Sequence, residues 1–254
     1  MVHRRRTSLL RRLGAVQRGV AATIPTAAVE TAPFISRRSP VVSINGMAAS
    51  SEPLVSEVGL RIMHAGGNCI DAAIAMAAAI NMCEPTMTGI GGDAFCLYYD
   101  KATGSVHGMN ASGRAPAALS IDVVTASTGR SYPSAMPSPV ERGCQHTVTV
   151  PGACAGWCDA VEKWGSGMTM DTILKPAIEM GESGYPIHKL TAAGWQAAAP
   201  LLNIMPNGRE MLVHDESGDG WRGPREAEGK SLNNMQTTQD VANLRLTVAF
   251  FAIQ

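Results

Sequence analysis

The arginine best placed for chemistry lies in the segment Ser112-Gly-Arg-Ala-Pro116, which follows a predicted strand. A guanidinium on such a loop can reach a carboxylate and bind it through two parallel hydrogen bonds. Functional residues are often carried on loops of this kind. The segment therefore indicates Arg114 as a candidate binding residue for a small carboxylate. On these residues alone, a solvated surface arginine is an equal alternative.

A glycine-rich segment, Thr88-Gly-Ile-Gly-Gly-Asp-Ala94, precedes the same predicted strand. It does not have the spacing of a dinucleotide fingerprint or a P-loop, and phosphate-binding loops lead into a helix rather than a strand. Nucleotide binding is therefore the least favoured hypothesis. We expect Gly89, Gly91 and Gly92 to allow close backbone approach, through positive φ or tight packing, and to shape the floor of a pocket.

The sequence offers no catalytic or metal-binding set. Its histidines are scattered, without a partner at the three- or four-residue spacing of metal ligands. The cysteines form no Cys-x-x-Cys pair, and the nearest approach is Cys154-x-x-x-Cys158 without a nearby histidine. We expect buried free thiols in a reducing interior. The prediction is no metal site and no catalytic residue in this chain.

Charge divides the 254-residue chain into two parts. The formal net charge is zero, with 45% hydrophobic and 17% charged residues, which excludes collagen, coiled coil and a generally basic nucleic-acid binder. Residues 1–38 hold eight arginines and one acid, Glu30. This basic leader is either a transit peptide or a disordered tail. We therefore expect an intracellular protein, mitochondrial if the leader is a transit peptide and otherwise cytoplasmic.

Residues 39–254 are predicted to form a single partial domain. The longest apolar run, Ala72 to Ile80, is nine residues, too short to cross a bilayer, so no membrane span is expected. Ser50 or Ser51 is predicted to cap a first helix, and Asn68 with Asp71 to form the capping box of a second. The further elements predicted are a β-hairpin at 94–110, a strand at 147–150, helices at 153–164, 169–183 and 189–199, and a surface loop at 127–146. This order indicates an α+β fold.

Five blocks in this sequence resemble the γ-glutamyltransferase family in order and spacing, over about residues 41 to 200. The blocks are Asn45-Gly-Met-Ala-Ala-Ser-Ser-Glu-Pro-Leu54, His64-Ala-Gly-Gly-Asn-Cys-Ile-Asp-Ala-Ala73, Glu84-Pro-Thr-Met-Thr-Gly-Ile-Gly-Gly-Asp-Ala-Phe95, Ala115-Pro116 and Val148-Thr-Val-Pro-Gly152. The resemblance implies an N-terminal-nucleophile hydrolase with an αββα sandwich, made as one chain that cleaves itself into a large and a small subunit. The match lies in the large subunit.

In that family, the nucleophile is the threonine that starts the small subunit, with its own amino group as general base and without a metal or organic cofactor. The large subunit holds the substrate's carboxylate with the arginine of an Arg-Glu-x-Ala-Pro pattern. Here Ser112 stands at that arginine's position, and Arg114 follows two residues later. Ser-Gly-Arg-Ala-Pro resembles the γ-glutamyltransferase-like branch, which includes amidohydrolases of other small carboxylate-bearing amides. The resemblance therefore implies Arg114 and Ser112 as substrate-binding residues.

Thr237-Thr238 resembles the paired threonines of a processing site, but an N-cap of a last helix is the favoured interpretation. We therefore expect the large-subunit portion of an incomplete sandwich, inactive without the small subunit of its precursor. The full-length form would act on glutathione, other γ-glutamyl compounds or related small amides. A non-catalytic truncated product that binds a ligand or partner, and a fragment that does not fold stably, are the alternatives.

Overall fold

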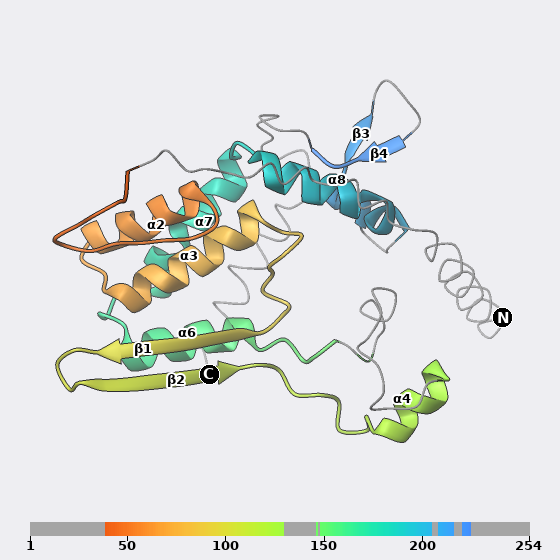
Figure 1. The fold of residues 1–254 in the computed structure, drawn as a ribbon, viewed down its shortest axis with the longest axis horizontal. Helices are drawn as coiled ribbons and strands as arrows, with labels where there is room; N and C mark the ends of the chain where they lie inside the picture. Colours follow the sequence, from red (N-terminus) through yellow and green to blue (C-terminus); the bar gives the residue numbers. More distant parts are fainter. Residues whose placement is uncertain (1–38, 130–145, 147, 205–207, 216–219, 225–254) are drawn as a thin grey trace. The chain divides into compact units, whose positions relative to one another are not determined.

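The computed structural model describes residues 39–129, 146, 148–204, 208–215 and 220–224. The chain divides into two compact units, which are described separately: the first comprises Met1–Val42 and Ala115–Thr149, and the second Ser43–Arg114 and Val150–Gln254. The first unit contains the helix α4 (Ile121–Thr128), capped by the Ser120 side chain. The second contains every other helix and strand of the described residues (Figure 1).

Helices α2 (Pro53–His64) and α3 (Cys69–Cys83) begin in different ways. Asn68 Oδ1 accepts hydrogen bonds from the backbone of Ile70 and Asp71, and the Asp71 carboxylate accepts one from the Asn68 N–H, so the predicted capping box is confirmed. The predicted serine cap of α2 is wrong. Its N-cap is Glu52, whose carbonyl accepts the Ser50 hydroxyl proton at 2.6 Å.

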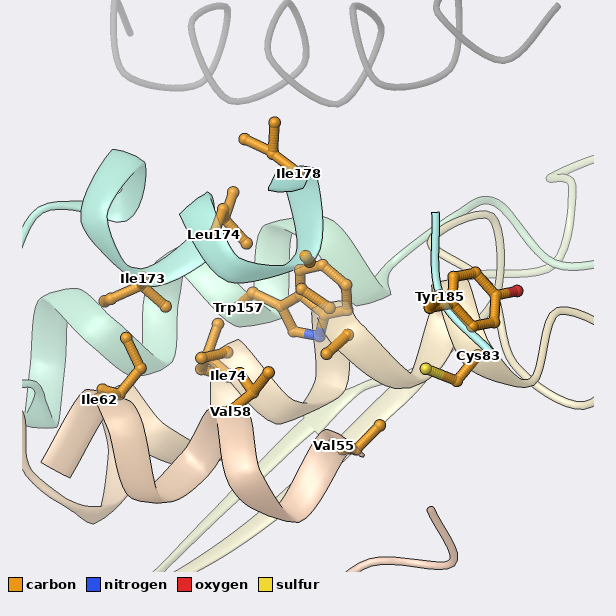
Figure 2. Packing of buried hydrophobic residues seen from close by; sticks show 14 of the residues in the cluster. Val55, Val58, Ile62, Ile74, Cys83, Trp157, Ile173, Leu174, Ile178 and Tyr185 are labelled. Carbon is orange, nitrogen blue, oxygen red and sulfur yellow. The ribbon is translucent and has the colours of Figure 1, made fainter. Parts of the chain in front are cut away.

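The hydrophobic core lies where α2, α3 and α7 (Met170–Ser183) pack side by side (Figures 1 and 2). Because α3 is apolar nearly all round, it can bury side chains against α2 and α7 at once. Trp157 from α6 (Ala153–Trp164) and Ile173 from α7 are 4% and 0% exposed. Burial of each such side chain contributes about 2 kcal/mol to folding.

A β-hairpin lies against α6 (Figure 1). Strands β1 (Ala94–Asp100) and β2 (Ser105–Ala111) pair antiparallel, in the register Ala94 with Ala111 through Asp100 with Ser105. The Asp100 carboxylate closes the turn by accepting bonds from the Ala102 N–H and the Thr103 hydroxyl. The predicted hairpin is confirmed.

The opposite face of this hairpin carries large apolar side chains that the described residues leave exposed. Phe95, Leu97 and Tyr99 alternate along β1 and are 71%, 84% and 60% exposed, and Val106 of β2 lies beside Tyr99 at 68%. Exposed apolar patches of this kind commonly mark an interaction surface. We call these four residues the bare hairpin face.

The remaining elements of the second unit follow α7. Helix α8 (Lys189–Ile204) is followed by the 3-10 helix η2 (Gly208–Met211), and its buried Trp195 donates a hydrogen bond from Nε1 to the Met211 carbonyl. Strands β3 (Val213–Asp215) and β4 (Gly220–Arg222) form a second antiparallel pair. Helices combined with antiparallel strand pairs confirm the α+β class.

Two local predictions are corrected by the structure. Residues 148–150 form no strand, although the Val150 N–H bonds to the Arg114 carbonyl at 3.1 Å. The helix α4 was not predicted, and its last residues fall within the predicted loop at 127–146. The candidate helix from Thr238 lies outside the described residues. Among the described residues, no helix is long and apolar enough to cross a membrane.

Candidate functional site

Three segments of the second unit meet at the end of the hairpin where β1 begins and β2 ends. They are the glycine-rich segment before β1, the loop after β2, and the chain that enters α6 (Figure 1). The Gly92 carbonyl accepts hydrogen bonds from the backbone N–H groups of Gly152 and Ala153, at 3.1 and 3.0 Å. Helix α6 has no side-chain cap, so the Gly92 carbonyl satisfies N–H groups at its start. The glycine-rich segment is thereby joined to α6.

Asp93 fixes the loop after β2 to the same junction. One carboxylate oxygen accepts the Gly113 N–H at 2.9 Å, and the other accepts the Ser112 hydroxyl proton at 3.1 Å. The Ser112 N–H in turn bonds to Asn110 Oδ1 at 2.9 Å. Hydrogen bonds to a charged acceptor are stronger than those between neutral groups. The carboxylate therefore holds the two residues that immediately precede Arg114.

Close contacts at the junction require glycine at three positions. A Cβ at Gly113 would lie 1.4 Å from the Val150 carbonyl oxygen, and one at Gly152 would lie 2.4 Å from that of Ala111. In the first turns of α6, a Cβ at Gly156 would lie 2.3 Å from the Ala111 Cβ. A side chain at any of these positions would push the loop after β2 away from α6.

The glycines that sequence reasoning singled out are a different set. An added Cβ would meet nothing within 4 Å at Gly89 or Gly91, and at Gly92 it would make an ordinary contact at 3.5 Å with the Gly89 carbonyl. None of the three has positive φ. The expectation that crowding or positive φ requires glycine here is therefore wrong. Their role in shaping a pocket stays a prediction.

Arg114 directly follows Ser112 and Gly113, the two residues that Asp93 holds, and it is exposed. Its main-chain carbonyl accepts the Val150 N–H, so the backbone is held on the side of α6 as well. Within the described part of the chain, no carboxylate pairs with its guanidinium. A fixed backbone with an unpaired guanidinium can bind an incoming carboxylate through paired hydrogen bonds. Sequence reasoning found Arg114 and Ser112 but missed Asp93, because an isolated acid has no motif of its own.

A serine–histidine pair in the first unit was also missed. The Ser127 hydroxyl and His146 Nε2 lie 2.6 Å apart, and the same hydroxyl donates a hydrogen bond to the Val124 carbonyl at 3.0 Å. The single hydroxyl proton of Ser127 can go either to that carbonyl or to His146, and the tautomer of the imidazole decides which group donates in the Ser127–His146 contact. No described carboxylate orients the imidazole. The pair therefore lacks the features of a nucleophile.

The described residues give no other candidate for the chemical step. Among residues 39–129, 146, 148–204, 208–215 and 220–224, no three His, Cys, Asp or Glu side chains gather in a way that could hold a metal ion. Thr237 and Thr238 lie outside the described residues. The exposed Arg114 guanidinium at the junction is a group of the kind that can bind an anion.

Comparison with known proteins places this arrangement in a class. The cephalosporin acylase from Bacillus halodurans has a similar structure, with a TM-score of 0.67 and 36% identity, over 85% of this chain and 38% of that one. The γ-glutamyltranspeptidases and acylases among the structural neighbours of this chain have the N-terminal-nucleophile hydrolase fold. The gamma-glutamyltranspeptidase family model matches residues 55–235. The chain belongs to the γ-glutamyltranspeptidase family.

Two curated relatives show how much of a family member this chain represents. It is 35% identical over 182 residues to the glutathione hydrolase proenzyme of Bacillus subtilis strain 168, covering 68% of this chain and 30% of the relative. It is 35% identical over 165 residues to the oxamate amidohydrolase proenzyme of Klebsiella pneumoniae, covering 63% of this chain and 29% of that protein. The chain thus spans about a third of the length of these relatives.

Proposed function

We propose that the chain is the large-subunit portion of a γ-glutamyltransferase-like hydrolase. Its full-length form would use an N-terminal threonine to hydrolyse or transfer the acyl group of γ-glutamyl compounds such as glutathione, or of related small amides. Family membership supports this reaction class. The names of the two relatives support both substrate groups, whose common feature is an amide in a small molecule that bears a carboxylate. The comparisons give no support to a non-catalytic binding protein.

Arg114 is proposed as the residue that binds the substrate carboxylate. The observation that carries this proposal is the exposed guanidinium, unpaired within the described residues, on a backbone held by Asp93 and Val150. Positioning a reacting group before the substrate arrives lowers the entropy lost on binding. Ser112 contributes by donating to Asp93, and Gly89, Gly91 and Gly92 would line the pocket floor.

The bare hairpin face supports the proposal that the partner of this chain is the small subunit of the same precursor. The hairpin packs against α6 on one face, but its other face keeps large apolar side chains in water, and such a surface favours a partner that covers it. Strands of the small subunit of the same precursor would cover Phe95, Leu97 and Tyr99 and complete the αββα sandwich. We propose no catalytic residue within this chain. Its arginine-rich leader supports a mitochondrial location, with the cytoplasm as the alternative.

Binding of a carboxylate by the purified 254-residue chain tests the role of Arg114. Nitrogen-15 NMR spectra are recorded while L-glutamate or oxamate is added, with oxamide, which has an amide in place of the carboxylate of oxamate, as the control ligand. We expect the amide signals of Gly113 and Arg114 to shift with L-glutamate and oxamate but not with oxamide. In Arg114→Ala the shifts at the same ligand concentration should become much smaller, whereas Lys101→Ala, which removes an exposed charge from the hairpin turn, should retain them. Equal shifts in Arg114→Ala would rule out this role.

A further inference from the structure

An asparagine–glycine pair lies in the segment that precedes α2. Asn45 and Gly46 are both exposed, and they belong to no helix or strand. Of the asparagines that the structure describes, Asn45 alone is followed by glycine, while Asn207, which also precedes a glycine, lies outside the described residues. Glycine has no Cβ, so its backbone nitrogen can approach the preceding side chain without a steric barrier. The pair therefore places an amide carbon next to an accessible nitrogen.

The side chain of Asn45 is not held in place. Among the described residues its carboxamide makes no hydrogen bond, and only its backbone N–H has a partner, the Ser43 hydroxyl at 3.3 Å. The other exposed or half-buried asparagines differ, because Asn68 Oδ1 accepts from the Ile70 N–H and Asn110 Oδ1 accepts from the Ser112 N–H, both at 2.9 Å. The Asn45 carboxamide is therefore free to rotate towards the Gly46 nitrogen.

The attacking nitrogen is held only loosely. The Gly46 N–H donates to Ser43 Oγ at 3.3 Å, which is longer than the usual 2.7–3.2 Å for such a bond. Exposed backbone with few hydrogen bonds opens locally at little cost in free energy. The main chain at Gly46 can therefore adopt the conformation that brings its nitrogen to the Asn45 side chain.

We propose that Asn45 is a site of deamidation in the folded chain. The Gly46 nitrogen attacks the carbonyl carbon of the Asn45 side chain and forms a bond to it. The side-chain nitrogen leaves as ammonia, together with the proton of the Gly46 N–H. Water then opens the resulting five-membered succinimide ring at either carbonyl, which gives aspartate or isoaspartate. The reaction consumes only water and does not depend on the function proposed for Arg114.

The product alters the chain directly before the core helix α2. A Cβ at Gly59 of that helix would lie 3.0 Å from the Ala48 Cβ, so the residues that follow Gly46 lie close to α2. Deamidation adds a negative charge to this segment. Isoaspartate also lengthens the main chain by one methylene group, next to the residues that make this contact.

Peptide mass spectrometry of the incubated chain tests the proposal. The 254-residue protein is kept at neutral pH, and the deamidated fraction is followed separately at Asn45, Asn68 and Asn110. We expect Asn45 to react at least about tenfold faster than the other two, because only its neighbour lacks a Cβ. Both aspartate and isoaspartate should form, whereas direct hydrolysis of the side chain gives aspartate alone. A rate at Asn45 no higher than at Asn110, or aspartate as the sole product, would overturn the proposal.

Gly46→Ala is the matched variant. The φ of Gly46 lies outside the left-handed region, and an added Cβ would first meet the flexible end of the Met63 side chain, so alanine can be accommodated. The methyl group should slow deamidation at Asn45 by roughly tenfold, because it hinders approach of the nitrogen. Equal rates at Asn45 in the variant and the native chain would contradict attack by the Gly46 nitrogen.

The native chain alone supplies a further test if Gly46→Ala does not fold. The rate at Asn45 is measured in the folded chain and in the chain unfolded by urea. Because the pair lies in an exposed segment, folding should slow deamidation at Asn45 by less than about tenfold. At Asn68, whose side chain caps α3, the slowing should be greater than at Asn45. A larger slowing at Asn45 than at Asn68 would show that the fold protects the pair and would refute the site.

Discussion

Asp71 and Asp93 both tie distant segments together through their carboxylates, but in opposite environments. Asp71 is completely buried, and it accepts the Asn68 N–H at 2.9 Å and the Ser166 N–H at 3.1 Å. These bonds join the start of α3 to the residues that follow α6, and Asn68 Nδ2 reinforces the link by donating to the Trp164 carbonyl at 2.7 Å. Asp93 is exposed and fixes Ser112 and Gly113 beside Arg114.

The same interaction, an aspartate carboxylate that accepts backbone N–H groups from a distant segment, thus serves two purposes. A buried N–H that loses its acceptor keeps the full penalty of desolvation, whereas an exposed one turns to water. The hydrogen bonds of Asp71, which we call the Asp71 junction, should therefore determine whether the helices pack. The hydrogen bonds of Asp93 to Ser112 and Gly113, which we call the Asp93 junction, should determine where the Arg114 backbone lies, with little effect on folding.

The largest expected effect is on stability, from Asp71→Ala. The change removes the completely buried carboxylate that accepts from the N–H groups of Asn68, which is half-buried, and of Ser166. We expect a loss of about 3 kcal/mol in the free energy of unfolding. Urea denaturation followed by circular dichroism measures it, with Asp71→Asn, which keeps one acceptor oxygen, as the matched control. If the two variants were equally stable and close to the native chain, the buried junction would not have the importance assigned to it.

Alkaline pH should weaken the same helical region next. Cys83 ends α3, and burial raises the pKa of its thiol to about 12. An unfolded thiol ionises near pH 8.5, so the stability from keeping Cys83 neutral is complete below that pH and is lost as pH rises towards 12, by at most about 1.4 kcal/mol per pH unit. Urea midpoints measured between pH 8 and 11 test this.

Cys83→Ala is the control for the alkaline effect, because it removes the ionisable group. Its midpoint should fall less steeply with pH than that of the native chain. A residual slope should remain, because burial also raises the pKa of the Tyr185 hydroxyl. Parallel slopes in the two proteins would mean that Cys83 does not contribute.

A smaller effect on stability is expected from Gly113→Ala, which should push the loop that Asp93 holds away from α6. The new methyl group would overlap the Val150 carbonyl, so the loop must move away from α6. Overpacking of this kind costs roughly 1–3 kcal/mol, and relaxation of an exposed loop favours the low end. Gly91→Ala is the control, since its methyl group meets nothing within 4 Å. Equal thermal midpoints for the two variants would show that the contact at Gly113 does not constrain the loop.

The smallest stability change is expected from Asp93→Asn. Its partners are exposed and can bond to water, so the free energy of unfolding should fall by less than about 1 kcal/mol. Amide hydrogen exchange at Gly113 should nevertheless become faster, because the charged acceptor of its N–H is lost. A stability loss as large as that of Asp71→Ala would erase the distinction between the two junctions.

From the sequence, only the contacts between residues close together in the chain could be predicted at each junction. The Asn68 and Asp71 capping box was predicted because its bonds span three residues, and the hairpin was predicted from its alternation and turn. The bond from Ser166 to Asp71 crosses 95 residues and leaves no local pattern. Helix α4 was missed because it is short and rich in β-branched residues, which give no clear helical period.

At the candidate site, the residue types were found but not their support. Arg114 stands out between small residues on a loop, and the resemblance drew attention to Ser112. The glycines that the junction requires include Gly113 and Gly152, and the crowding at these two depends on which carbonyl approaches from another segment. That approach is a tertiary property, and it cannot be predicted from glycine spacing.

The most direct test of the account is a double-mutant cycle with Asp93→Asn, Arg114→Ala and the double variant, in which L-glutamate binding to the 254-residue chain is measured by NMR titration. If Asp93 acts by positioning Arg114, Asp93→Asn should weaken binding several-fold while the urea midpoint stays close to that of the native chain. In the Arg114→Ala background, Asp93→Asn should cause no further loss. Affinity unchanged by Asp93→Asn, or losses that simply add, would contradict the central claim that this carboxylate holds Arg114 in place to bind a substrate.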